Sequence, residues 1–185
     1  MVAYFQLQPA EAELQELAEQ YWKHSSEKQQ ELEKAAFEAG EAIRNGEYTL
    51  ANVEAIVRWK SERAVQYLIG NSNEKIKRAL TVAAAPESTT EDAVKALTEL
   101  HGVDIAVASA ILAAIFPERY TALDYRVLQA LGHAPHDLKF YEEYLDFCKR
   151  LAESNIVSTQ AGLPGAAPLR TLSRALSQWS LSHGE

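Results

Sequence analysis

Hydrophobic residues recur every three or four positions along most of the chain, which is the spacing of amphipathic helices. A first helix would open at Pro9 and run to about Trp22. Its apolar residues would share one face: Leu14, Leu17, Ala18 and Tyr21. No stretch alternates apolar and polar residues as a half-buried strand would. The pattern therefore predicts an all-α fold.

Capping residues indicate where further helices begin. Ser26 and Gln29 have the spacing of a capping box, as do Ser88 and Glu91 ahead of the next apolar stripe. The only long loop expected covers residues 154–168, where glycines and prolines gather. We expect one compact domain, residues 1–185, of about nine or ten helices.

The centre of this fold is expected at Ile105–Phe116, where every residue except Ser109 is apolar. A helix that is apolar on every side must be surrounded by other elements. Residues 88–132 would thus form two helices joined by a tight connection, followed by a helix that begins at Asp124. The connection is formed by four residues: His101, Gly102, Val103 and Asp104.

The 185 residues, 47% of them hydrophobic and 24% charged, are typical of a globular protein with a substantial core. The single cysteine, Cys148, excludes an internal disulfide framework and is expected to be a buried thiol. The five histidines lack metal-ligand spacing, so we predict no catalytic metal. No apolar run is long enough for a membrane helix and no secretory signal is visible, so the expected location is the cytoplasm.

Charge is distributed unevenly along the chain. The net charge of −8 disfavours nonspecific attraction to nucleic acid, and residues 1–50 contribute −6 of it. Residues 51–85, in contrast, hold six basic and three acidic side chains, for a net charge of +3. This basic segment is either a solvated helix face or a surface that contacts phosphate.

Residues 97–132 resemble the helix-hairpin-helix DNA glycosylase superfamily. The resemblance depends on the Leu-x-Gly-Val hairpin at 100–103, on the buried alanine-rich helix that follows, and on Phe-Pro-Glu-Arg-Tyr leading to Asp124. More narrowly, the chain is similar to a group of small bacterial proteins with an oxoguanine-glycosylase-like fold. The matching segments lie between positions 59 and 176: Trp59–Arg63, Ala108–Leu112, Tyr120 with Asp124, and Leu169–Leu176.

The resemblance implies base excision, in which a nucleotide is extruded from duplex DNA and its glycosidic bond is cleaved in a pocket. Asp124 matches the superfamily's carboxylate, which orients water or stabilises positive charge on the sugar. Asp124 is equally well placed to cap a helix. Ala106 stands where bifunctional members have a lysine, so the implied enzyme is a monofunctional hydrolase. No cofactor is expected, although superfamily hairpins can hold a monovalent cation on backbone carbonyls.

Ten residues are candidates for contact with duplex DNA. Trp59 would stack on a base or pack in the core, and Lys60 and Arg63 would hold a phosphate or form a solvated pair. The hairpin amides and His101 would contact the backbone of the strand. The full set is Trp59, Lys60, Arg63, His101, Gly102, Val103, Asp104, Tyr120, Tyr125 and Arg126.

Asp104, Ala106 and the acidic balance of the chain support a different interpretation. Asp104 replaces the second glycine of the hairpin, where Asp can adopt a left-handed backbone but places a negative charge beside the expected phosphate. Arg126 replaces a frequent histidine. The alternative function is a non-catalytic interaction module that binds protein or DNA. An unrelated helical bundle is the third interpretation.

Overall fold

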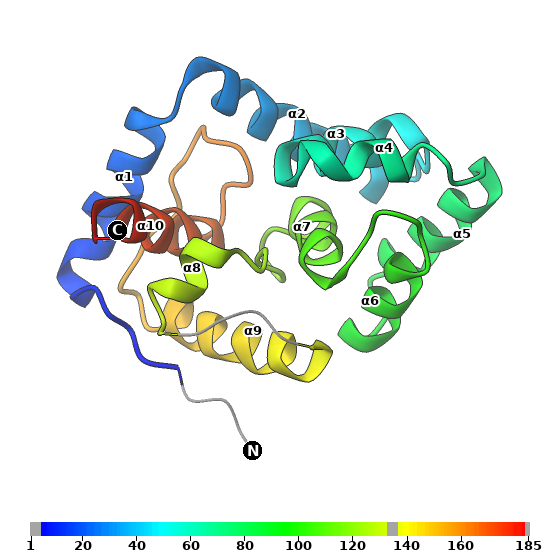
Figure 1. The fold of residues 1–185 in the computed structure, drawn as a ribbon. Coiled ribbons are helices and arrows are strands. Elements are labelled where there is room, and N and C mark those ends of the chain that lie inside the picture. Colours follow the sequence, from blue (N-terminus) through cyan, green and yellow to red (C-terminus); the bar gives the residue numbers. More distant parts are fainter. Residues whose placement is uncertain (1–4, 133–136, 184–185) are drawn as a thin grey trace.

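The computed structural model describes residues 5–132 and 137–183, and within these ranges every regular element is a helix (Figure 1). The all-α prediction and the expected number of helices are confirmed for this part of the chain. Its ten α-helices are α1 Leu14–His24, α2 Glu27–Arg44, α3 Leu50–Lys60, α4 Val65–Leu68, α5 Asn73–Ala83, α6 Thr90–Thr98, α7 Ile105–Ile115, α8 Tyr125–Gln129, α9 Leu138–Glu153 and α10 Pro168–His183. Short 3-10 helices, η1 Glu11–Glu13 and η2 Glu62–Ala64, precede α1 and α4.

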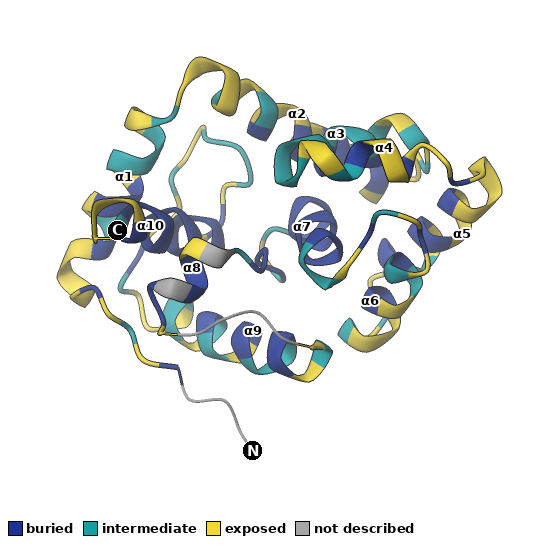
Figure 2. Ribbon diagram, in the orientation of Figure 1, coloured by how far each residue is buried: buried dark blue, intermediate teal, exposed yellow. Residues whose placement is uncertain are grey.

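Helix α7 lies at the centre of the fold, as its apolar sequence predicts, and packs against α2, α3 and α6 (Figures 1 and 2). On the other side of the molecule, α10 is buried among α1, α8 and α9. One hydrophobic core extends from Phe5 to Leu176 and includes Cys148. Although α7 is almost wholly apolar, it has only 11 residues. No helix in the described ranges combines the length and apolarity needed to cross a membrane.

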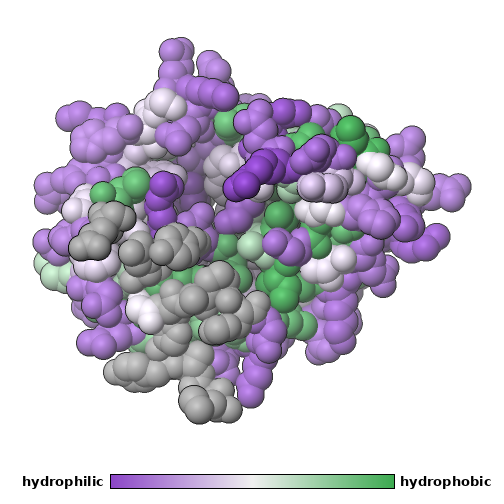
Figure 3. Space-filling view, viewed as in Figure 1, coloured by the Kyte–Doolittle hydropathy of each residue, from purple (hydrophilic) through white to green (hydrophobic). Residues whose placement is uncertain are grey.

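Figure 3 shows the surface on the side of the molecule seen in Figure 1. Hydrophilic residues cover most of this face, and the visible hydrophobic residues gather near its middle, around the position of α7. Helix α2 packs closely on the central helix α7, and this packing depends on Gly40. A Cβ atom at Gly40 would lie 2.0 Å from the carbonyl oxygen of Ala114, so only glycine permits this close approach of α2 and α7.

Most predicted helix starts are confirmed, with two shifts. The Ser26–Gln29 capping box is present, whereas α6 is capped by the hydroxyl of Thr89, which accepts a hydrogen bond from the Asp92 amide. The predicted Ser88 cap is wrong because the Ser88 amide belongs to the preceding turn, where it donates to the carbonyl of Ala85. The first helical residue is Glu11 rather than Pro9.

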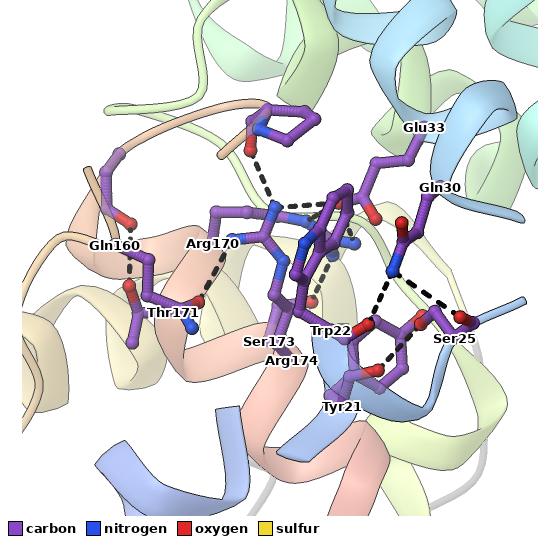
Figure 4. A network of polar contacts seen from close by, with 12 residues as sticks. Tyr21, Trp22, Ser25, Gln30, Glu33, Gln160, Arg170, Thr171, Ser173 and Arg174 are labelled. Atoms are coloured by element: carbon purple, nitrogen blue, oxygen red, sulfur yellow. Dashed lines mark hydrogen bonds and ion pairs between the residues drawn. The ribbon is translucent and has the colours of Figure 1, made fainter. Parts of the chain in front are cut away.

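Helices α2 and α10 are joined by a buried group of charges (Figure 4). The carboxylate of Glu33 accepts hydrogen bonds from the Arg170 Nε at 2.7 Å and from the Arg174 Nη2 at 3.0 Å. Arg174 also donates to the carbonyl of Pro164 and to the side chain of Gln160 in the loop before α10. Glu33 on α2 is thus connected to α10 directly and, through Arg174, to the loop before α10; both lie more than 120 residues later in the sequence.

This group contains two cations for one anion. Burial opposes the charge on Arg170, but Glu33 outweighs it and holds the pKa of Arg170 above its ordinary value. Burial and the neighbouring Arg170 lower the pKa of Arg174 to about 10. The Arg174 guanidinium additionally lies over the ring of Trp22, 5.3 Å from its centre. The aromatic face and the shared carboxylate together stabilise a charge that is 1% exposed to solvent.

Replacement of Glu33 by Gln should destabilise the protein strongly, because both arginines would then be buried without a counter-charge. We expect the free energy of unfolding, measured by urea denaturation, to fall by about 3–5 kcal/mol. Glu38→Gln, on an exposed position of the same helix, serves as control and should change it by less than about 0.5 kcal/mol. Equal losses in the two variants would show that the Glu33 interaction does not hold α2 to α10.

Candidate active site

The loop between α7 and α8 is held by side chains from two other helices, α3 and α9. Its carbonyls at Thr121, Ala122 and Leu123 each accept one hydrogen bond. The donors are, in order, the hydroxyl of Tyr141 (3.0 Å), the hydroxyl of Tyr144 (3.2 Å) and the amine of Lys60 (2.8 Å). Successive carbonyls that are all bonded to side chains leave the loop little freedom, so the residue that follows is placed accurately.

Ser109, the one polar residue in α7, holds the same loop from the central helix. Its hydroxyl accepts a hydrogen bond from the Leu123 amide at 2.7 Å and donates one to the carbonyl of Ala106. Ser109 is fully buried, and these two bonds satisfy it there. Its position in an otherwise apolar helix is therefore explained by the loop that carries Asp124.

Asp124 is the N-cap of α8, as predicted, and both of its carboxylate oxygens have partners. Oδ1 accepts a hydrogen bond from the Arg126 amide at 2.8 Å, and Oδ2 lies 3.4 Å from the Nζ of Lys60. The Asp124 side chain is 42% exposed, while that of Lys60 is only 14% exposed. The carboxylate is thus held in place from within the protein but remains accessible from outside.

The same contacts keep Asp124 ionised. Burial by itself raises the pKa of its carboxyl, but the charge of Lys60 and the hydrogen bond from the Arg126 amide outweigh it, and the pKa is lowered below the ordinary value for Asp. At neutral pH this group is a carboxylate that can accept hydrogen bonds and stabilise positive charge. It is not an acid that could donate a proton.

Asp124 lines a pocket of about 200 Å³ between α1, α2, the end of α3 and α10. This volume is below the range of about 300–1,000 Å³ typical of sites for drug-sized ligands, so it suits a single small group. Its walls are mostly polar and combine cationic, anionic and hydroxyl-bearing side chains. The lining residues are Tyr21, Ser25, Gln29, Leu32, Glu33, Trp59, Lys60, Ala122, Asp124, Arg126, Arg170, Ser173 and Ser177.

Trp59 forms part of one wall, and its packing on the core is confirmed. Its ring packs against Phe37, with 5.3 Å between centroids, and the guanidinium of Arg170 lies 5.2 Å from its centre. The residue is nevertheless half-buried and lines the Asp124 pocket. Trp59 therefore packs on the core with one part of its surface and faces the pocket with another.

The connection between α6 and α7 turns at Gly102, whose φ of +83° is in the left-handed region. A Cβ atom there would lie 2.9 Å from both the carbonyl oxygen of Ala64 and the Cβ of Tyr67, so the turn packs directly on the segment around α4. Asp104 does not adopt the left-handed backbone of a hairpin glycine: its φ is −88° and its backbone is extended. The Asp104 carboxylate instead caps α7 by accepting a hydrogen bond from the Val107 amide at 2.8 Å.

The backbone amides of the connection between α6 and α7 are only partly paired. The backbone of His101 is paired with the buried side chain of Asn71, which accepts from its amide and donates to its carbonyl, both at 3.0 Å. The Val103 amide donates to the carbonyl of Leu100. Within the described ranges, the amides of Gly102 and Asp104 have no hydrogen-bond partner.

The structure sorts the predicted residues into two places. Trp59, Lys60, Asp124 and Arg126 line the pocket, whereas residues 101–104 lie apart from it, where the turn packs on the segment around α4 and Val103 is buried. Among the other candidates, Arg63 is exposed near the hairpin and Tyr120 is buried. The side chain of Tyr125 lies outside the described part of the chain.

Four important residues were not singled out by sequence reasoning. Asn71 bonds to the backbone of His101, Ser109 holds the loop before Asp124, and Glu33 and Arg170 pair in the wall of the Asp124 pocket. Ser109 offered a signal, since a lone polar residue in an apolar helix needs a partner. Glu33 and Asn71 lie among other polar and charged residues of their segments, without the contrast that Ser109 shows, so nothing in the sequence marked them as buried.

Comparison with known proteins gives no match for this chain: no family model, no curated protein and no solved structure is significantly similar to it. Within residues 5–132 and 137–183, His, Cys, Asp and Glu side chains form no group of three or more that could hold a metal ion. The interpretation of the site depends on its geometry.

Lys60→Met should raise the pKa of Asp124, because the burial of the carboxyl remains while its main opposing charge is lost. The measurement is an NMR titration of the Asp124 side-chain carbon. In the unaltered protein the ionised group stabilises the fold at neutral pH, and this contribution is lost as the pH falls through the lowered pKa. The stability of Lys60→Met should therefore depend less on pH in that acidic range.

Arg58→Met is the matched control for this experiment. It removes one positive charge from the same turn of α3, but Arg58 pairs with Glu54 and Glu62 and not with Asp124. If the pKa of Asp124 moved equally in both variants, the effect would be a general one of charge and the Lys60 contact would have no special role.

Proposed function

We propose that this protein is a DNA-glycosylase-like hydrolase that binds duplex DNA and cleaves the N-glycosidic bond of a flipped, damaged or modified base. Residues 88–132 would then form a helix-hairpin-helix unit, with the hairpin on the sugar–phosphate backbone and Asp124 at the sugar. The observation that carries the proposal is the ionised, half-exposed carboxylate of Asp124 in the wall of a polar pocket.

The chemistry of Asp124 fits bond cleavage with developing positive charge on the sugar. A fixed carboxylate stabilises such a charge or orients the attacking water, and it does so best when it needs no reorganisation during the reaction. The side chains that hold the loop at 121–124 provide this preorganisation, and Lys60 keeps the group ionised. Ala106 is half-buried at the start of α7, in keeping with a hydrolase that has no amine there.

The surroundings of the hairpin support a contact with the DNA backbone. The amides of Gly102 and Asp104 lie next to the N-terminus of α7, where the helix dipole favours an anion. Exposed cations are found on the neighbouring elements, with Arg63 in η2 and Lys75 and Arg78 on α5. These groups suit a strand that crosses the hairpin.

Asp124→Asn should abolish base release, because it removes the negative charge and keeps a residue that caps helices well. We expect a loss of about 100-fold or more in the rate of cleavage of duplexes that carry a panel of damaged or modified bases. The control is Asp137→Asn, the same substitution at the N-cap of α9. The control should keep its activity, and activity that survives in Asp124→Asn would remove Asp124 from the catalytic role.

The second candidate function, a non-catalytic module that binds protein or DNA, is favoured by one observation. The carboxylate of Asp104 occupies the N-terminus of α7 and satisfies the Val107 amide that an anionic ligand would otherwise meet. This negative charge repels a phosphate at the same place. Absence of base release from every duplex in the panel would favour this function.

Asp104→Asn tests whether the hairpin contacts DNA, because Asn preserves the cap and removes the charge. If a strand passes there, affinity for a labelled duplex should rise about threefold at low salt, as expected for loss of one exposed like-charge interaction. Fluorescence anisotropy over a range of salt concentrations gives both the affinity and its salt dependence. Unchanged affinity in the variant would place the DNA elsewhere on the protein.

A further inference from the structure

A second, larger hollow lies on a different face of α2 from the Asp124 pocket. It has a volume of about 900 Å³ and is bounded by α2, by the C-terminal end of α7 and by residues 162–166 in the loop before α10. We call it the α2 groove. Its lining runs from Glu27 to Asn45, which is about 27 Å of helix at 1.5 Å per residue.

The floor of the α2 groove is apolar. Phe37, Ala114 and Ile115 are buried beneath it, while Trp22 and Leu163 are half-buried and line it as well. The loop lies against the aromatic floor, since a Cβ atom at Gly165 would be 2.4 Å from the Phe37 ring. An apolar floor of this kind suits aliphatic side chains of a bound segment.

The rim of the α2 groove is acidic. Four exposed glutamates line it, spaced along α2 so that they share one face of the helix: Glu27, Glu31, Glu38 and Glu41. None of the four forms an ion pair within the described ranges. The two cations of the rim are Lys34 and Arg44, and the charge of Arg44 is already paired with Glu118 at 2.9 Å.

The end of α7 adds to this negative potential. Ala114 and Ile115, the last two residues of the helix, both line the groove. The C-terminal end of a helix carries partial negative charge from its unpaired carbonyls and attracts cations. The acidic rim and the helix end are independent features, and both select for positive charge over the same apolar floor.

We propose that the α2 groove is a docking site for a basic segment of a partner protein, one that combines Lys or Arg with aliphatic side chains. The apolar residues of the segment lie on the floor between Trp22 and Ile115, and its cations face the four glutamates and the end of α7. DNA is excluded from this face by the same charges. The groove and the Asp124 pocket use different faces of α2, so both can be occupied at once.

The test uses three fluorescein-labelled ten-residue peptides with alternating residues: Lys-Leu, Glu-Leu and Lys-Ser. Binding to the whole protein is measured by anisotropy, and contact with the groove by the change in Trp22 emission, assigned with Trp22→Phe. We expect the Lys-Leu peptide to bind, the Lys-Ser peptide to bind more weakly and the Glu-Leu peptide not to bind. Equal binding of the Lys-Leu and Glu-Leu peptides would overturn the proposal.

Two double variants decide whether the rim is responsible. Glu31→Gln with Glu38→Gln should weaken Lys-Leu binding about fivefold, the effect of two exposed ion pairs, and leave DNA binding unchanged. Glu74→Gln with Glu153→Gln removes the same charge from exposed positions on α5 and α9 and should have no effect.

Equal weakening by both pairs would show that only overall charge matters, and it would overturn the proposal. Sedimentation of the protein alone at rising concentration tests for another occupant. Self-association that the Glu31/Glu38 pair abolishes would identify a second copy of this chain in the groove, in place of a basic partner. All of these results are independent of base excision.

Discussion

The arrangement of this protein depends on one buried carboxylate that two arginines share. Glu33 fixes α10 against α2, and Arg174 extends the connection to the loop before α10. Isolated charges in a core are costly, so this group is stable only when all of its members meet with correct geometry. That requirement sets the spacing of α2 and α10, and with it the walls of both the Asp124 pocket and the α2 groove.

A second set of polar contacts positions the loop that carries Asp124. The loop before α8 has no regular structure of its own, yet its carbonyls and an amide are bonded to Tyr141, Tyr144, Lys60 and Ser109. Each of these side chains comes from a helix that is itself packed in the core. Asp124 is therefore positioned by the rigid part of the fold, although it belongs to a loop, and such support is what a preorganised carboxylate needs.

Helix α2 separates two surfaces of opposite character. On one face Glu33 is neutralised by arginines and the pocket beyond it contains Lys60 and Arg126. On the other face the glutamates remain exposed above an apolar floor. Of the basic segment 51–85, only Lys60 lines the pocket, and its other cations, Arg126 and Arg170, come from later in the chain. A protein with a net charge of −8 can in this way present cations locally to an anionic ligand.

The sequence by itself determined the helices, the central place of α7 and the capping role of Asp124, because these follow from local periodicity and from side-chain contacts a few residues apart. It could not determine that Lys60 turns toward Asp124 or that Glu33 meets Arg170, since these residues are 64 and 137 positions apart. It also left Asn71 unmarked beneath the hairpin. Only the tertiary structure decided which polar side chains are buried together, because the cost of burying them is met by partners that packing, and not sequence neighbourhood, supplies.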